Sequence, residues 1–247
     1  MLDSLFEHPT KGGDYAATRL GIQRAHPSIL CFCELLAYMA SSSQDSSLAP
    51  AEITLVADGE LFRAKERIIL KVRDLLSELQ LGLQEDLGRT ALLVPPGFDP
   101  SKAQFVKGER LEACPYQYLD YPKHFLGDDK FTFRSLCWWG HHLAFAMIVD
   151  GGQVKQCKKN FFDRFHQLAG QGLELSLAPT FWEWKRGEGY TLPITHDRKA
   201  QLAAVLSGRA WFKIARFVPL DSPAMREGRL PEVGRETFRS LLPLLTP

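Results

Sequence analysis

The segment HLAFAMIVD, residues 142–150, constrains the fold most, because seven consecutive uncharged residues separate His142 from Asp150. A short apolar run of this kind predicts a central strand whose two faces are both covered. Alternation then places Phe145 and Met147 on one face and Ala144 and Ala146 on the other. We expect the bulky face to fill a thick core layer and the alanine face to let a helix pack closely.

Further elements follow this strand in a recognisable order. The sequence predicts a helix over 153–170, a strand over 173–179, a hairpin over 180–194 that turns at 187–189, a helix over 197–208, a strand over 210–220 and a closing helix over 231–245. The strand–helix–strand order predicts a right-handed βαβ crossover and therefore a mixed sheet. Lys213 and Arg216 indicate that the strand over 210–220 is partly exposed or lies at an edge.

The first hundred residues have a helical character. A long helix is predicted over 58–88, with Asp58 as its N-cap and an apolar stripe that includes Leu61, Ile68, Val72 and Leu79. The breadth of the stripe favours a core-facing helix over a dimer seam. The fold class is therefore α+β: a mainly helical part over 1–100, then a mixed β-sheet with a βαβ crossover and flanking helices over 101–247. One continuous domain is the alternative.

Composition limits the classes of partner. The chain of 247 residues carries 30 basic and 29 acidic residues, so its net charge gives no reason to expect nucleic acid or an anionic membrane. The apolar run over 27–40 is interrupted by Glu34 and is too short to span a bilayer. The five cysteines show no CxxC spacing and are interpreted as buried free thiols, which favours the cytoplasm. No motif identifies a cofactor.

The stretch CWWGHH, residues 137–142, raises the question of a metal or haem site. Adjacent histidines on a strand point to opposite faces, so His141 and His142 do not share one metal, and the chain has no HExxH or CxxCH pattern. We expect a buried, neutral His142 that is bonded to the backbone, and a His141 that contacts a ligand. The prediction for this stretch is therefore a binding surface without a metal.

Tyrosines supply the rest of that surface. In the segment CPYQYLDYPKHF, residues 114–125, Tyr116 and Tyr118 share one strand face, where they suit either stacking on a ligand or packing at the rim of the core. Together with Trp139 and His141 they form the predicted ligand-binding set. The leading hypothesis is a non-catalytic protein that binds a small molecule or a protein segment in this aromatic groove.

Two alternatives belong to other classes. Glu183 and Lys185 in the segment EWK, completed by Asp150, predict a metal-dependent phosphodiesterase or nuclease, in which carboxylates hold a divalent ion and the lysine orients water. A cross-strand ion pair is the competing interpretation of Glu183 and Lys185. The third hypothesis is a homodimer that buries the helix over 29–39 and the helix that carries Leu61.

Overall fold

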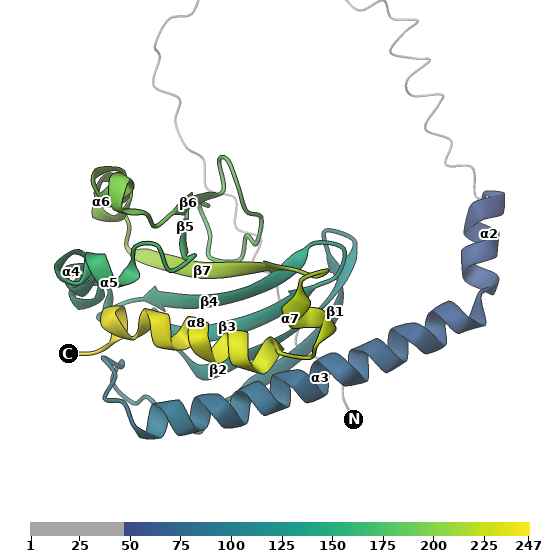
Figure 1. The fold of residues 1–247 in the computed structure, drawn as a ribbon, viewed down its shortest axis with the longest axis horizontal. Coiled ribbons are helices and arrows are strands. Elements are labelled where there is room, and N and C mark those ends of the chain that lie inside the picture. Colours follow the sequence, from purple (N-terminus) through teal and green to yellow (C-terminus); the bar gives the residue numbers. More distant parts are fainter. Residues whose placement is uncertain (1–46) are drawn as a thin grey trace, which may run out of the picture. The chain divides into compact units, whose positions relative to one another are not determined.

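The computed structural model describes residues 47–247 (Figure 1). The contacts divide the chain between Ala57 and Asp58. Before this boundary lies helix α2 (Pro50–Ala57), none of whose residues is buried. The predicted helix over 27–40, with Cys31 and Cys33, lies outside the described residues. The sheet and the helices from residue 58 onward belong to the second unit, Asp58–Pro247.

A seven-stranded sheet forms the centre of this unit, in the order β1-β2-β3-β4-β7-β5-β6. The strands are β1 (Gln104–Leu111), β2 (Cys114–Leu126), β3 (Asp129–Trp138), β4 (His142–Asp150), β5 (Glu174–Ser176), β6 (Thr191–Pro193) and β7 (Trp211–Pro219). Every pair of neighbours is antiparallel. The α+β class is confirmed, but the prediction of a mixed sheet is wrong: β4 and β5 run in the same direction with β7 between them, antiparallel to both.

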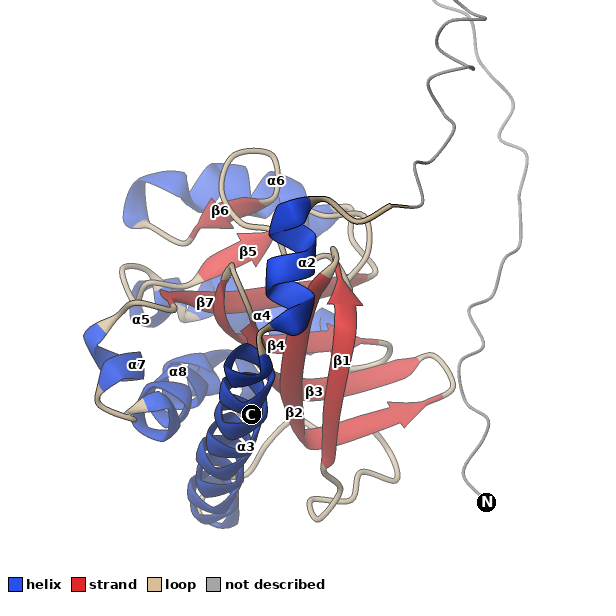
Figure 2. Cartoon of the chain, turned by 90° about the vertical axis from the view of Figure 1, so that its right-hand side faces the viewer, coloured by secondary structure: helices blue, strands red, loops and turns tan. Residues whose placement is uncertain are grey.

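Helices cover one face of this sheet. They are α3 (Gly59–Gly88), α4 (Val154–Asp163), α5 (Phe165–Leu168), α6 (Lys199–Ser207), α7 (Pro223–Arg226) and α8 (Leu230–Leu245), with a 3-10 turn η1 (His196–Arg198) before α6. Figures 1 and 2 show α3 and α8 side by side on the same face. Their apolar side chains and those of the facing strands form the larger hydrophobic core.

The long helix begins where the sequence predicts. The side chain of Asp58 accepts hydrogen bonds from the backbone N–H groups of Glu60 and Leu61, so the N-cap is confirmed. Its buried stripe, however, starts only at Ile69, and Leu61 and Ile68 are each 43% exposed. The prediction that the whole stripe faces the core is therefore wrong for the first ten residues of α3.

The central strand is confirmed with the predicted bounds, because β4 spans His142–Asp150. All residues from His142 to Val149 are buried. Trp138 ends β3, and the next three residues form a tight turn in which Gly140 has a φ of +73°. Such a conformation favours glycine because it has no Cβ. Trp138 and His142 are thus partners across a hairpin, and the expectation that His141 and His142 are neighbours on one strand is wrong.

Two predictions for the C-terminal half also fail. Strand β7 lies between β4 and β5, and its Lys213 is only 1% exposed, so the strand is not an edge. The hairpin predicted over 180–194 is formed instead by β5 and β6. Residues 177–190, which connect these two strands, form a loop that we call the strap. Glu183 and Lys185 therefore lie on a loop and not on a strand.

Candidate functional site

The strap covers the face of the sheet that the helices leave open. Trp184 of the strap is 3% exposed and belongs to a second apolar cluster with Ala144, Ala146 and Ala215. These small side chains on β4 and β7 leave the space that the indole fills. The expectation that a helix packs against the alanine face is therefore wrong, because a loop with one large aromatic residue occupies it.

Two side chains of the sheet, Lys213 and His142, bind backbone carbonyl groups of the strap. Lys213 donates hydrogen bonds to the carbonyl oxygens of Phe181 and Glu183, and its amino group lies 4.1 Å from the centre of the Trp184 ring. Nε2 of His142 lies 3.1 Å from the carbonyl oxygen of Trp184. Because a carbonyl only accepts, Nε2 carries the hydrogen. The carbonyl groups of the strap therefore bind side chains of the sheet instead of the backbone N–H groups of a neighbouring strand.

Burial changes the protonation of both anchoring groups. It lowers the pKa of Lys213 from 10.5 to about 7, and the Glu183 carboxylate only partly offsets this effect. It lowers the pKa of His142 from 6.5 to about 4, against the hydrogen bond to Trp184, so this imidazole is neutral at pH 7. The prediction of a buried, neutral, backbone-bonded His142 matches this geometry.

A row of planar side chains crosses the open surface beside the strap. The Tyr116 and Tyr118 rings are nearly parallel, with centroids 6.2 Å apart. The Arg134 guanidinium carbon lies 3.8 Å from the centre of the Tyr118 ring and 4.9 Å from that of Trp182. Trp182 in turn meets Phe125 edge to face at 6.1 Å. We call Tyr116, Tyr118, Trp182 and Phe125 the aromatic row.

A buried ion pair holds the middle of this row. Arg134 and Asp120 form two parallel hydrogen bonds of 2.7 Å, and their side chains are 6% and 0% exposed. A bidentate pair fixes the plane of the guanidinium. Tyr118 and Trp182 contact this fixed plane, so their rings are held in place while Trp182 and Phe125 remain 45% and 38% exposed.

The residues predicted to bind a ligand are only partly brought together. Tyr116 and Tyr118 lie on the strap side of β2, and Trp138, directly opposite Tyr116, is on the same face. His141 is exposed and stacks on Trp138 at 3.6 Å. Trp139 instead packs against the larger core on the helix side. The tyrosines and His141 thus share a face that Trp139 does not.

The residues predicted for catalysis have separate partners. Asp150 pairs with Lys130 at 3.2 Å, and Lys185 pairs with Glu112 at 2.5 Å. Glu183 accepts hydrogen bonds from the backbone N–H groups of Trp184 and Lys185. Within residues 47–247, no three His, Cys, Asp or Glu side chains are placed to hold a metal ion.

Two of the three thiols in the described residues, Cys137 and Cys157, offer little nucleophilic character. Cys114, Cys137 and Cys157 are free. Burial raises the pKa of both Cys137 and Cys157 to about 12, so these two thiols keep their protons near neutral pH.

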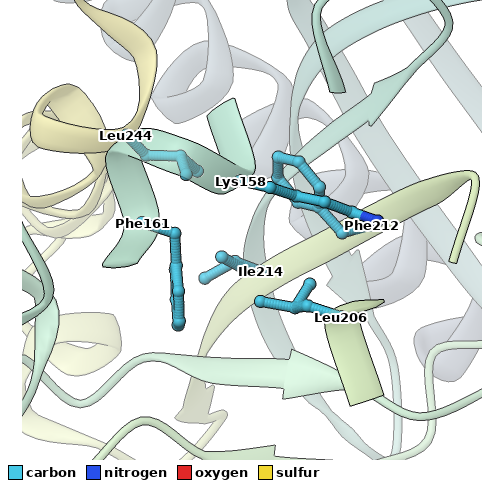
Figure 3. A pocket seen from close by; sticks show the side chains of 6 residues that line it. All are labelled: Lys158, Phe161, Leu206, Phe212, Ile214 and Leu244. Carbon is cyan, nitrogen blue, oxygen red and sulfur yellow. The ribbon is translucent and has the colours of Figure 1, made fainter. Parts of the chain in front are cut away.

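One apolar hollow lies inside the fold, between α4, α6, β7 and α8 (Figure 3). It has about 140 Å³ of empty volume but no room for a water molecule, and it is lined by Lys158, Phe161, Leu206, Phe212, Ile214 and Leu244. Lys158 donates a hydrogen bond to the carbonyl oxygen of Arg209 at its margin. The hollow is a gap in side-chain packing rather than a ligand site.

No protein-family model, curated protein or solved structure matches the chain. In the described part of the chain, from residue 47 onward, no helix combines the length and the apolar character needed to cross a membrane.

Sequence reasoning missed Arg134, Asp120 and Trp182 as parts of one cluster. A signal was present for Arg134, because it is the one charged residue between Phe131 and Trp138, in the segment FTFRSLCW. A charge inside such a strand needs a buried partner. Asp120 is that partner in the neighbouring strand, opposite Arg134 in the register.

Proposed function

We propose that the protein binds a segment of another protein on the aromatic row and has no catalytic activity of its own. The observation that carries this proposal is the arrangement of Tyr118 and Trp182 on the buried Arg134–Asp120 pair, in which Tyr118 is partly buried and Trp182 is 45% exposed. Aromatic side chains that are already ordered before binding lose little conformational entropy in a complex. They are also the residues most enriched among binding hot spots.

An open surface favours a protein segment over a small molecule. Small-ligand sites are concave and bury most of the ligand. The aromatic row lies on the strap side of the sheet, and the strap contributes Trp182 to it. The nuclease alternative lacks comparable support, because Asp150, Glu183 and Lys185 each bind a different partner.

Photo-crosslinking inside cells tests the proposal. A photoreactive phenylalanine analogue replaces Trp182, and we expect a covalent adduct of one discrete mass after irradiation. The adduct should disappear when Tyr118→Ala is added, because the neighbouring ring is lost. The same analogue at Leu81, which is 64% exposed on α3, is the matched control. No discrete adduct at Trp182, or the same adduct from both positions, would contradict the proposal.

A second candidate function is self-association through α3. It keeps the homodimer hypothesis for the helix that carries Leu61. Apolar side chains remain exposed in the first half of this helix: Leu61 is 43%, Phe62 52% and Ile68 43% exposed. Helix residues of this kind usually face either a core or a partner. Since the core does not cover them, a second copy of the chain is the partner that we propose.

A further inference from the structure

A groove on the helix side of the sheet lies between α3 and the edge strand β1. It is a hollow of about 260 Å³ with apolar side chains from both elements, including Ile69, Leu70, Leu76 and Phe105. Leu70 is 56% exposed and thus partly open to solvent. An ion pair of 2.5 Å between Lys65 and Glu109 links the two elements. We call this hollow the α3–β1 groove; it is separate from the aromatic row except that Tyr118 of β2 borders both.

The strand beside the groove has a free backbone edge. β1 is the terminal strand of the sheet and pairs in regular register with β2 from Gln104 to Gly108. Among residues 47–247, no backbone hydrogen bond joins β1 to any segment other than β2. An edge of this kind can pair with an extended peptide, which then forms an additional strand.

Charge in the groove has one sign. Arg73 of α3 and Lys107 of β1 both line it, and no acidic residue does. The Arg73 guanidinium lies flat on the Phe105 ring, 3.4 Å from its centre. Neither Arg73 nor Lys107 forms an ion pair with any residue that the structure describes. The groove therefore complements an anionic ligand.

A buried acceptor in the groove also lacks a donor. Gln117 of β2 is 5% exposed and lines the groove, and its amide nitrogen donates to the carbonyl oxygen of Ile69 at 2.9 Å. Its Oε1 atom is buried without a hydrogen-bond partner. Reversing the amide would leave the Ile69 carbonyl facing an oxygen, so the present orientation is the better one. The wall of the groove therefore contains a buried acceptor without a donor.

From these four observations we infer that the α3–β1 groove binds an extended, acidic segment of another protein as an added strand on β1. The spacing defines the segment further. Phe105 and Lys107 both line the groove and are two residues apart, as side chains on one face of a strand must be. Cross-strand pairing then calls for a large apolar residue and an acidic residue that are also two positions apart. Because Arg73 and Lys107 are two separate cations, a segment with acidic side chains suits the groove better than a single C-terminal carboxylate does.

Peptide display tests this inference. Two libraries of capped ten-residue peptides are compared on the full-length protein. The acidic library has a fixed Leu-Xaa-Glu or Glu-Xaa-Leu core, because the added strand can run in either direction, and the basic library has Lys in place of Glu. We expect the acidic library to be enriched at least about tenfold over the basic one, since like charges in an interface are strongly disfavoured. Arg73→Glu and Lys107→Glu should each remove or reverse this preference.

Arg67→Glu provides the matched control, because it reverses an exposed charge on the same helix outside the groove lining. This variant should keep the wild-type preference. Amide NMR shifts with one selected peptide should concentrate in residues 104–108 and should persist in Trp182→Ala, which separates this site from the aromatic row. No enrichment, equal loss in all three charge variants, or shifts confined to the aromatic row would overturn the inference.

Discussion

His141 and His142 are neighbours in the chain but differ in their surroundings. His141 is exposed on a turn, whereas His142 is 8% exposed and meets the edges of Trp138 and Phe217. Burial lowers the pKa of His142 from 6.5 to about 4. The difference follows from the hairpin that begins β4 at His142 and leaves His141 outside the sheet.

His142→Gln should remove part of the acid sensitivity of the fold. Between pH 6.5 and about 4, the unfolded protein binds a proton at His142 that the folded protein excludes, so wild-type stability falls as pH decreases through this window. The loss at the low end is on the order of 3 kcal/mol. Urea unfolding at pH 7 and 4.5 should show a smaller pH difference for the variant. His141→Gln should keep the wild-type difference; equal behaviour of both variants would contradict the assignment.

The strap shows why its alternating sequence misled the prediction. In WEWK, residues 182–185, aromatic and charged residues alternate as they do in a half-buried strand. The carbonyls of this segment instead bind Lys213 and His142, and the Glu183 carboxylate binds two of its N–H groups. Local sequence does not reveal these partners, because they come from strands that are distant in the chain.

Lys213→Met should loosen the strap. The substitution keeps the length of the side chain but removes the donor to Phe181 and Glu183, leaving two carbonyls without their partner. Amide hydrogen exchange over 181–186 should become at least about tenfold faster, while exchange in β4 stays slow. Lys185→Met removes the ion pair with Glu112 and a contact with the Tyr190 ring but leaves the carbonyl bonds of Lys213 intact, and it is the control. Unchanged exchange in Lys213→Met would show that packing of Trp184 alone holds the strap.

Helix α8 approaches α3 and the sheet closely at Gly234. A Cβ atom on this residue would lie 2.7 Å from the Leu79 methyl carbons and 3.0 Å from the Phe145 ring, and both of these side chains are fully buried. Gly234→Ala should therefore lower the free energy of unfolding by about 1 to 3 kcal/mol, despite the better helix propensity of alanine. Gly88→Ala is the control, because nothing lies within 4 Å of its added Cβ. Thermal unfolding of both variants measures the difference, and equal stability would contradict the close approach.

The sequence predicts several helices and strands of the fold correctly, but it does not predict the order of the strands in the sheet. Periodicity identified β4, α3, β7 and α8, because burial imposes a regular pattern on each of them. The order of the strands depends on contacts between distant segments, and the insertion of β7 between β4 and β5 has no local signal. Tyr116 and Tyr118 of the aromatic row were in the predicted set, but the rest of the row and the arginine that supports it were missed for the same reason: Phe125, Arg134 and Trp182 come from three separate segments.

Self-association of the full-length chain provides the last test, because Leu61, Phe62 and Ile68 form an exposed apolar group in the first half of α3. Light scattering with size-exclusion chromatography should give a dimeric mass that decreases on dilution. Leu61→Glu combined with Phe62→Glu should give a monomer whose unfolding free energy is unchanged within about 0.5 kcal/mol, since exposed substitutions have small effects on a single chain. Leu81→Glu, at a 64% exposed position farther along α3, should remain dimeric. A wild-type protein that is monomeric at every concentration would exclude the α3 dimer and leave the proposal for the aromatic row unaffected.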